Sequence, residues 1–527
     1  MTPPSKLTTI DQVLPLIRDD STLACSGFCT ASVANYFCSS FAKYFAANQS
    51  PKNLTLVYAA GQGDGQTEGL NHFAIPKAVK RVVGGHYNLA PKLGKMALAN
   101  EIEAYNFPQG VISSGYRSLA RNEPFVISRI GLHTFVDPRL EGGKVTPECS
   151  EDLVSLMEID GVEYLKYKLP KLDVVVIRGS IADHEGNISM QDEGVNADVL
   201  VIAQACKANN GIVIAEVNSV VPHLSRDAKI LPINVHVPGV FVDHVLEIPE
   251  EFQCQTFKTK FNPDFIGVDC WEENGETSSA PVPPLLRSIV GSRSAMEFLH
   301  LKPNPVCNIG IGMPEDCAFW CNKNSISLVN TVEVGGLEGI PASGLNFGCM
   351  YKPRAIIPQN SMFDSYHSGT FLDVAVLGLA EVDQLGNLNV SKFGTRLAGS
   401  GGFIDIAQSC PTILFVGTFN AGKLEVDIKD GKLVIVKEGT MKKFVKKVQQ
   451  VTFSAYFATL KKQVVKYITE RATFELINGV LTLMSIAPGV DLQRDVLDHM
   501  DFIPAIADCE SLVDADYFKF LKMDFFQ

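Results

Sequence analysis

Residues 172–190 read LDVVVIRGSIADHEGNISM, and residues 372–390 read LDVAVLGLAEVDQLGNLNV. Both segments open with Leu-Asp-Val, continue as a short apolar run and end in Asp-x-x-Gly-Asn. The offset is 200 residues throughout, as Asp183 and Asp383 show. Asp, Gly and Asn in these places favour a tight turn, because glycine accepts positive φ and Asx side chains bond nearby backbone. A repeat this long is not a solenoid, and it predicts two similar domains in tandem.

A second echo follows, four residues out of register with the first. IAQAC occupies residues 202–206 and IAQSC occupies residues 406–410. Around both echoes, β-branched runs such as DVVVIR, IVIAEV, TILFVG and LVIVKEG are interleaved with stretches of expected helix, such as MKKFVKKVQQVTFSAYF at 441–457. Short apolar strands that alternate with helices predict an α/β fold whose sheets are buried on both faces.

The length of the chain agrees with more than one domain. It has 527 residues, which exceeds what one hydrophobic core usually supports. The segment CWEENGETSSAPVPP at 270–284 is polar, contains three prolines and lacks a helical or strand period, so it is the best linker in the chain. We therefore expect an N-terminal α/β domain over 1–275 and a C-terminal α/β domain over 285–527.

Composition and charge exclude several classes of function. The 46 basic residues against 58 acidic ones leave a net charge of −12, so neither nucleic acid nor a membrane is an expected partner. The 13 cysteines form no CxxC pair, which indicates reduced thiols and no metal site. The N-terminal segment carries Asp11, Asp19 and Asp20 and lacks a signal-peptide apolar core, so a cytoplasmic location is expected.

Three glycine clusters partly match known functional motifs. The sixth position of the motif that begins Gly310-x-Gly312 is a glutamate, so it fails as a dinucleotide fingerprint, and residues 61–65 (GQGDG) lack the Lys-Ser/Thr of a phosphate loop. Residues 398–402 (AGSGG) are close to the nucleophile-elbow motif, with Ser400 as the nucleophile. Only one histidine, His499, follows Ser400 in the sequence. A tight turn is the simpler interpretation of each cluster.

One carboxylate is harder to explain by structure alone. Residues 331–348 read TVEVGGLEGIPASGLNFG, and the nearest cations along the chain to Glu333 are Lys323 and Lys352. An exposed turn acid is the ordinary alternative. A solvated turn, however, does not need the apolar residues that surround this glutamate, so Glu333 is a candidate functional residue.

The segment resembles the active-site segment of class I coenzyme A-transferases, and the match is closest to the fused, single-chain branch of that family. The resemblance extends over nearly the whole chain. It includes GQGDGQTEGLNHFA (61–74), GGHYNLAPKLGKMALANEIEAYNFPQGVIS (84–113), FVDPRLEGGKV (135–145), GSGGFIDIAQ (399–408) and IAPGVDLQRDVLDHM (486–500).

The resemblance implies a fold and a reaction. Two similar α/β domains would hold an active site at their interface. The Glu333 carboxylate would attack an acyl-CoA and form a glutamyl-CoA thioester, from which a second carboxylic acid takes the CoA. It also implies acyl-CoA and a short-chain carboxylic acid as substrates, no prosthetic group, and a homo-oligomer (dimer or tetramer).

The resemblance also implies where the oxyanion of each tetrahedral intermediate is stabilised. The donors map to the side-chain amide of Gln109 and to the backbone N–H of Gly402, and CoA would bind beside Gly401, Gly402 and Phe403. At the 200-residue offset Glu333 corresponds to His133, so the first half carries no second nucleophile.

The chain departs from the usual family pattern near the expected acyl pocket. The departures are Glu338 and His133 in place of glycine, the triplet 368–370 (SGT), and Asp405 in GGFIDI where GGFINI is more usual. They leave the choice among acetate, propionate, butyrate and succinate open. An acyl-CoA hydrolase that uses the same glutamate is the alternative enzyme. A silent CoA-binding protein would be expected to have lost Glu333 or Gln109, and this chain has lost neither.

Overall fold

The computed structural model describes residues 5–224, 230–267, 282–508 and 511–521. The chain forms two compact units. The first unit combines most of the N-terminal half with two later segments, Val332–Ser365 and Phe393–Asp405. Most of the linker expected at 270–284 lies outside the described residues, so the predicted domain boundaries at 275 and 285 stay a prediction.

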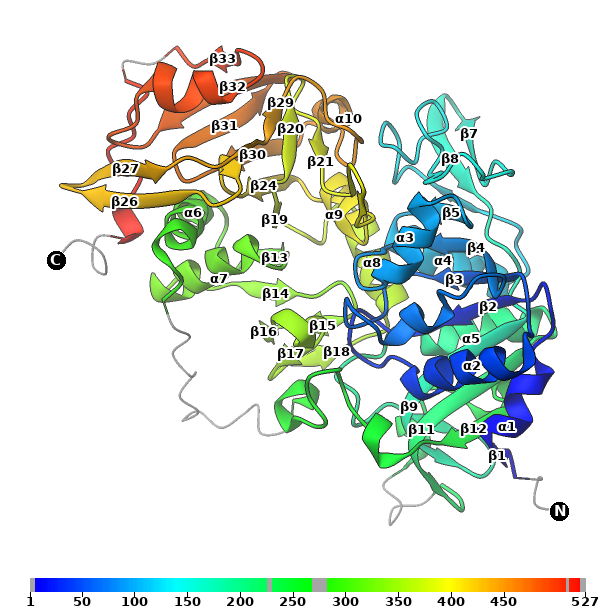
Figure 1. Cartoon of the computed structure of the whole chain (residues 1–527). Coiled ribbons are helices and arrows are strands. Elements are labelled where there is room, and N and C mark those ends of the chain that lie inside the picture. The colour runs from blue at the N-terminus through cyan, green and yellow to red at the C-terminus, as the bar shows by residue number, and fades with distance from the viewer. Residues whose placement is uncertain (1–4, 225–229, 268–281, 509–510, 522–527) are drawn as a thin grey trace. The chain divides into compact units, whose positions relative to one another are not determined.

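The first unit is built on a parallel sheet (Figure 1). Every neighbouring pair along its main path is parallel. The strands in spatial order are β1 (Leu7–Thr8), β12 (His244–Glu247), β11 (Ile212–Val221), β9 (Val174–Asp183), β2 (Thr22–Cys25), β3 (Leu54–Tyr58), β4 (Val79–Gly84) and β5 (Glu103–Asn106).

Helices cover this sheet, as its apolar strands require. On one face, Phe37 and Phe41 of α2 (Asn35–Asn48) and Leu93 of α3 (Pro91–Leu98) share a buried core with side chains of the central strands. The helix α5 (Val199–Ala208) packs on β9 and β11 and also contacts α4 (Gln109–Ala120). The strand β9 begins with seven consecutive buried residues, which is typical of a strand in a sheet that is covered on both faces.

The carboxyl ends of the central strands all lie at one edge of this sheet. The loops that leave this edge begin after Cys25 of β2, Tyr58 of β3, Gly84 of β4 and Asn106 of β5. Ligands of open α/β sheets bind outside this edge, because the loops there converge and helices begin there. The edge is therefore the first place to look for a site.

The later segment of the first unit folds into small hairpins. The strands β15 (Gly336–Leu337) and β18 (Ala355–Ile356) pair antiparallel, as do β16 (Ile340–Pro341) and β17 (Met350–Tyr351). The helix α8 (Gln359–His367) follows them.

The second unit has its own predominantly parallel sheet. Its strands run in the order β14 (Val329–Thr331), β13 (Val306–Ile309), β19 (Val374–Gly378), β24 (Thr412–Val416), β30 (Val464–Ile468), β31 (Ala472–Ile477), β32 (Val480–Ile486) and β33 (Ala505–Ile506). The first five strands are parallel to one another, and β30, β31 and β32 alternate in direction. The helices α6 (Leu285–Met296) and α7 (Met313–Lys323) pack on each other. The predicted α/β class is confirmed.

The repeated turn has the same geometry in both units. Asp183 Oδ1 accepts hydrogen bonds from the backbone N–H groups of Glu185 and Asn187 at 3.0 and 2.9 Å, and Asp383 Oδ1 accepts the equivalent pair at 3.0 Å each. The glycine that follows each aspartate has φ of +86° in the first unit and +85° in the second. The predicted role of Asp-x-x-Gly-Asn as a tight turn is confirmed.

The prediction of a helix at 441–457 is wrong for most of this segment. The segment instead forms the strands β28 (Met441–Lys442) and β29 (Phe444–Val445), and only α10 (Ala455–Leu460) is helical. Lys443, which a surface helix would expose to water, donates a hydrogen bond from Nζ to the Leu379 carbonyl at 3.1 Å. Tertiary pairing has overridden the local helical pattern here.

No helix among the described residues is both long enough and apolar enough to cross a bilayer.

Candidate active site

Glu333 is held in place by the residues on either side of it. Val332 and Val334 are buried and pack into a small core with Phe28, Ala31 and other apolar side chains of the first unit. The carboxylate between them is only half-buried. Two anchored neighbours fix the backbone of Glu333 and leave its side chain accessible.

The Glu333 carboxylate lies against Gly402. A methyl group built on Gly402 would stand 3.2 Å from Glu333 Cδ and 3.3 Å from each carboxylate oxygen. Such contacts are tighter than ordinary van der Waals packing, so any side chain at position 402 would crowd the carboxylate. Among the described residues, the Gly402 N–H has no hydrogen-bond acceptor and is available as a donor.

The loop that carries Gly402 is fastened to the carboxyl edge of the parallel sheet. The Gly401 N–H donates to the Gly85 carbonyl at 2.7 Å, directly after β4. The Ser400 N–H donates to Asn106 Oδ1 at 3.0 Å, at the end of β5. Gly401 itself has φ of +53°, a left-handed conformation that a side chain would disfavour.

Gln109 joins this arrangement from the start of α4. Its backbone N–H donates to the Gly401 carbonyl at 3.0 Å, and a methyl group built on Gly401 would lie 3.9 Å from Gln109 Oε1. The first unit therefore brings Gln109, Gly401, Gly402 and Glu333 together. Phe403 is the first residue of α9 (Phe403–Ser409), immediately after them.

The electrostatic setting of Glu333 is unusual for a carboxylate. Among the described residues it has no ion pair and no hydrogen-bond donor. Loss of hydration and, secondarily, the nearby charge of Asp405 raise the pKa of Glu333 to about 7. An acid without compensating partners retains its proton more tightly because the charged form is the one that burial penalises.

Cys29 is a neighbour of Glu333 that the sequence did not suggest. It belongs to the loop after β2, and the pKa of its thiol is raised by burial and by the Glu333 charge. Cys29 and Ser32 both have positive φ, at 53° and 49°, which is strained for residues other than glycine. Their left-handed conformations lack a local signal such as glycine or asparagine, so sequence alone did not reveal the loop.

His86 is a second residue that the sequence did not suggest. It follows Gly85 at the end of β4, and its ring lies 3.8 Å from a methyl group built on Gly401. Burial and the charge of Arg396 lower the pKa of His86 to about 4, so its imidazole is neutral near pH 7. Although it stands in one of the matched segments, at 84–113, only the fold places it beside Gly401.

The other sequence candidates do not join this group. Ser400 is 4% exposed, and its Oγ has no hydrogen-bond partner among the described residues, so no base activates it there. The Gly310-x-Gly312 turn and α7, which follows it, belong to the second unit. His133, aligned with Glu333 by the repeat, lies in the first unit, and its backbone N–H donates to Asp137 Oδ2 at 2.8 Å.

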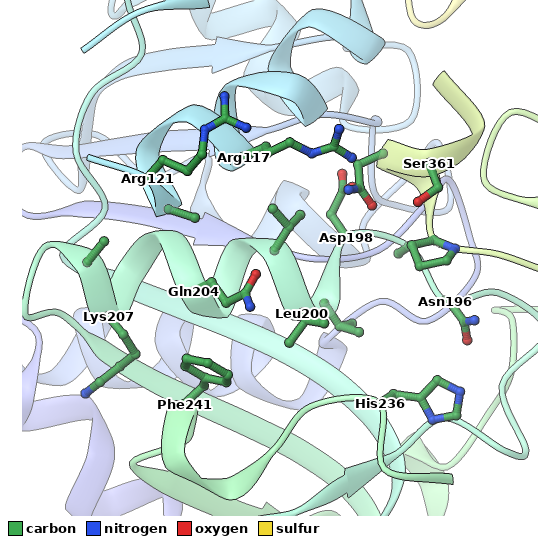
Figure 2. Close-up of a pocket in the computed structure, with 17 residues that line it drawn as sticks. Arg117, Arg121, Asn196, Asp198, Leu200, Gln204, Lys207, His236, Phe241 and Ser361 are labelled. Carbon is green, nitrogen blue, oxygen red and sulfur yellow. The ribbon is translucent and has the colours of Figure 1, made fainter. Parts of the chain in front are cut away.

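A cavity of about 610 Å³ lies elsewhere in the first unit, between α4, α5 and the start of α8 (Figure 2). Three basic side chains line the cavity. Each forms an ion pair with an acidic residue that does not line it: Arg117 with Asp364, Arg121 with Glu123, and Lys207 with Asp243. Glu333, Gln109 and Gly402 are not among the lining residues. Its cations are already neutralised, and it is distinct from the Glu333 group.

A protein site for a metal ion needs several ligating side chains grouped together. Within the described parts of the chain, no three or more His, Cys, Asp or Glu side chains are grouped so that they could hold a metal ion. The Gly402 N–H and the Gln109 amide near Glu333 are instead groups that can donate hydrogen bonds to a developing negative charge.

The chain was compared with known proteins. The sequence profile described as Coenzyme A transferase matches residues 7–247. Caffeate CoA-transferase of Acetobacterium woodii is 41% identical over 512 residues, covering 95% of each chain. Acetate CoA-transferase YdiF of Escherichia coli K12 is 38% identical over 512 residues, covering 97% of this chain and 94% of its own.

A solved structure is similar along nearly the whole chain. The acyl-CoA transferase YdiF of E. coli O157:H7, determined as a thioester complex with CoA, superposes with a TM-score of 0.88 at 36% identity. The match covers 98% of this chain and 96% of the E. coli chain.

Proposed function

Because the chain belongs to the coenzyme A transferase family, we propose that it moves CoA from a short-chain acyl-CoA to a free carboxylic acid through a thioester on Glu333. The observation that carries the proposal is the Glu333 carboxylate, which has no partner among the described residues and lies against Gly402, near the Gln109 amide. The E. coli relative, determined as a thioester complex with CoA, supports a covalent route.

The first half of the reaction starts with the Glu333 carboxylate. Its oxygen attacks the thioester carbonyl of the acyl-CoA, the carbon–sulfur bond breaks, and CoA leaves as a thiolate from a mixed anhydride. The thiolate then attacks the Glu333 carbonyl of that anhydride. The acyl carboxylate leaves, and glutamyl-CoA remains.

The second half runs the same steps in reverse with another acid. Its carboxylate attacks glutamyl-CoA, CoA thiolate leaves, and the thiolate then attacks the new acyl carbonyl. The products are a new acyl-CoA and the regenerated Glu333 carboxylate. No proton relay is needed, because an ionised carboxylate is already nucleophilic.

Each addition produces a tetrahedral oxyanion, which needs donors already in place. We assign the Gly402 N–H and the Gln109 side-chain amide to this role. The backbone of Gln109 is bonded to Gly401, and the two residues before Gly402 are bonded to Gly85 and Asn106, so the loop and the helix start need little reorganisation when charge develops. CoA itself would bind along Gly401, Gly402 and Phe403.

The physiological acid is the finer part of the proposal. The two relatives are named for acetate and for caffeate, so their names span a small aliphatic acid and a larger aromatic one. A matrix of acyl-CoA donors against acetate, propionate, butyrate, succinate and caffeate tests the short-chain assignment. Rapid transfer to caffeate alone would overturn the short-chain class.

The kinetic order distinguishes transfer from hydrolysis. One nucleophile that serves two acids in turn predicts ping-pong kinetics, with parallel double-reciprocal plots at several acceptor concentrations. Intersecting plots would contradict the covalent route. Release of CoA at the full rate without any acceptor would identify a hydrolase instead.

The raised pKa of Glu333 predicts how the activity depends on pH. The nucleophile is the ionised form, so kcat/KM for acyl-CoA should rise as the pH passes about 7 and level off above it. One pH unit below that pKa about a tenth of the carboxylate is ionised, so the rate should be roughly ten-fold lower there. A flat profile from pH 5.5 to 8.5 would contradict this prediction.

Asp405 should set part of that pH dependence. Its side chain accepts a hydrogen bond from the Gly110 N–H at 3.1 Å, and its charge raises the pKa of Glu333. Asp405→Asn removes the charge and should move the midpoint of the pH profile to lower pH. The midpoint should stay above the ordinary 4.5, because burial is the larger cause of the raised pKa.

A matched control separates this local effect from a change in net charge. Asp20 lies just before β2, at the amino ends of the strands of the same sheet, and its exposed carboxylate forms an ion pair with Lys80. Asp20→Asn removes this carboxylate. Its midpoint should equal that of the parent. An unchanged midpoint in Asp405→Asn would mean that the charge of Asp405 does not contribute to the raised pKa of Glu333.

A further inference from the structure

The imidazole of His86 stands between two glycines at the carboxyl edge of the first sheet. A methyl group built on Gly61 would lie 2.8 Å from His86 Nδ1 and 2.9 Å from the His86 carbonyl oxygen. These contacts are too close for any side chain, so a glycine at position 61 leaves the room that the ring occupies. Gly61 belongs to the loop after β3 and His86 to the loop after β4.

The other side of the ring faces the loop that carries Gly402. A methyl group built on Gly401 would lie 3.8 Å from His86 Cδ2, and the Glu333 carboxylate lies against Gly402, the next residue. Nε2 is bonded to Cδ2 in an imidazole, so Nε2 is the ring nitrogen on the side of Gly401. The ring and the carboxylate are therefore neighbours of one dipeptide, and all of these residues belong to the first unit.

The His86 imidazole has no hydrogen bond and no ion pair among the described residues. The residue is only partly exposed. Buried polar groups in native proteins are almost always hydrogen-bonded, to protein or to water. A ring nitrogen without a protein partner beside the candidate nucleophile is available to a bound substrate.

The protonation state of His86 suits a donor. Burial and the charge of Arg396 lower the pKa of His86 to about 4, so from pH 5.5 to 8.5 the ring carries one N–H and one bare nitrogen. A neutral imidazole can polarise a carbonyl, as an electrophilic donor. It brings no positive charge that would pair with the ionised Glu333 and weaken it as a nucleophile.

The proposed reaction needs donors at two different oxygens. When Glu333 attacks the acyl-CoA, negative charge develops on the oxygen of the acyl group. When the CoA thiolate attacks the anhydride, negative charge develops on the oxygen of Glu333 itself. The Gly402 N–H is next to the Glu333 carboxylate, which suits the second charge.

We propose that His86 is a further catalytic residue, whose Nε2–H donates a hydrogen bond to the acyl oxygen while Glu333 attacks the acyl carbon. The role rests on the proposed function, because it requires Glu333 to be the nucleophile. As the carbon–oxygen bond to Glu333 forms, the electron pair of the acyl carbonyl moves to its oxygen. The pair returns when the carbon–sulfur bond breaks and CoA thiolate leaves, and the His86 proton stays on nitrogen throughout.

Two replacements of His86 test the donor. His86→Leu removes both ring nitrogens but keeps an apolar side chain, and adduct formation with acyl-CoA at pH 8 should slow about 10²-fold in a single turnover. Binding of a non-reactive acyl-CoA analogue should change much less, because the charge develops only in the transition state. His86→Gln restores an N–H near the position of Nε2 and should form the adduct within about ten-fold of the parental rate.

Hydroxylamine separates the two oxyanions. Its nitrogen attacks the Glu333 carbonyl of glutamyl-CoA, CoA leaves as a thiolate, a hydroxamate remains on Glu333, and the excess proton passes to solvent. Charge then develops on the Glu333 oxygen and not on an acyl oxygen. The adduct of His86→Leu, accumulated by longer incubation, should therefore release CoA to hydroxylamine at the parental rate.

The pH profile and a matched control exclude an effect of charge or of folding. His86→Leu replaces a neutral group, so the midpoint near pH 7 set by Glu333 should not move. His244→Leu replaces another partly buried histidine of the first unit, on β12, which β11, β9, β2 and β3 separate from β4. This control should form the adduct at the parental rate.

The outcomes separate this inference from the function on which it rests. If His86→Leu forms the adduct at the parental rate, or if His86→Gln is no faster than His86→Leu, His86 is not a donor. Equal slowing of adduct formation and of the hydroxylamine step, or a shifted midpoint, would also refute the assignment. If the parent forms no adduct at Glu333 and transfers no CoA, the proposed function is wrong instead.

Discussion

Replacing Glu333 with alanine should abolish CoA transfer and the covalent adduct together, because it removes the proposed nucleophile. Incubation of the parent with acyl-CoA and no acceptor should leave CoA attached at Glu333, as intact mass spectrometry followed by peptide mapping would show. The variant should carry no adduct. Its melting temperature should stay within a few degrees of the parent, since the buried anchors Val332 and Val334 are unchanged.

Glu250 provides the matched control. It is an exposed carboxylate of the first unit and forms a 2.5 Å ion pair with Lys260. Glu250→Ala should retain both the adduct and the turnover. A thioester on Cys29 or Ser400 in the parent, or parental turnover by Glu333→Ala, would refute the assignment of the nucleophile.

Replacing Gln109 with alanine should slow turnover by ~10²–10³, which corresponds to about 2.7–4 kcal/mol of transition-state stabilisation. The nucleophile remains, so the variant should still form the Glu333 adduct, only more slowly. Affinity for acyl-CoA should change much less, because the proposed role of Gln109 concerns charge that develops only in the transition state. Stopped-flow measurement of CoA release, beside equilibrium binding of a non-reactive acyl-CoA analogue, distinguishes the two effects.

Gln204→Ala is a suitable control for the loss of a glutamine side chain. Gln204 lies on α5 and lines the separate cavity, away from Glu333. It should turn over at the parental rate. Parental turnover by Gln109→Ala would mean that Gln109 is not an oxyanion donor.

The parts of the fold that the sequence predicted are those encoded in short segments. The strands DVVVIR, IVIAEV and TILFVG lie within β9, β11 and β24 or overlap them closely, because a sheet buried on both faces leaves a continuous apolar run. The turns at Asp183 and Asp383 were also predicted from a local pattern, because their hydrogen bonds join residues no more than four apart.

The helix predicted at 441–457 shows the limit of local pattern. A segment with lysines in pairs between apolar residues suits an amphipathic helix, yet β28 and β29 form there because partner strands are available. Lys443 is held at the Leu379 carbonyl, 64 residues away in sequence. No window of neighbouring residues contains that partner.

The candidate site divides in the same way. The sequence identified Glu333, Gln109 and Gly402 as a group through a resemblance that extends over long and specific segments. It did not identify Cys29 or His86, because neither carries a local signal of function. Cys29 becomes a neighbour of Glu333, and His86 a neighbour of Gly401, only through contacts between segments far apart in the sequence.

The internal repeat and the matched segments were enough to place this protein in the α/β class and in the coenzyme A transferase family, with a carboxylate nucleophile expected at Glu333. The raised pKa of that carboxylate and its neighbours Cys29 and Asp405 became apparent from the fold. Apolar periodicity and turn chemistry act between neighbours in the chain. Desolvation and the pairing of buried polar groups depend instead on what distant segments bring into contact.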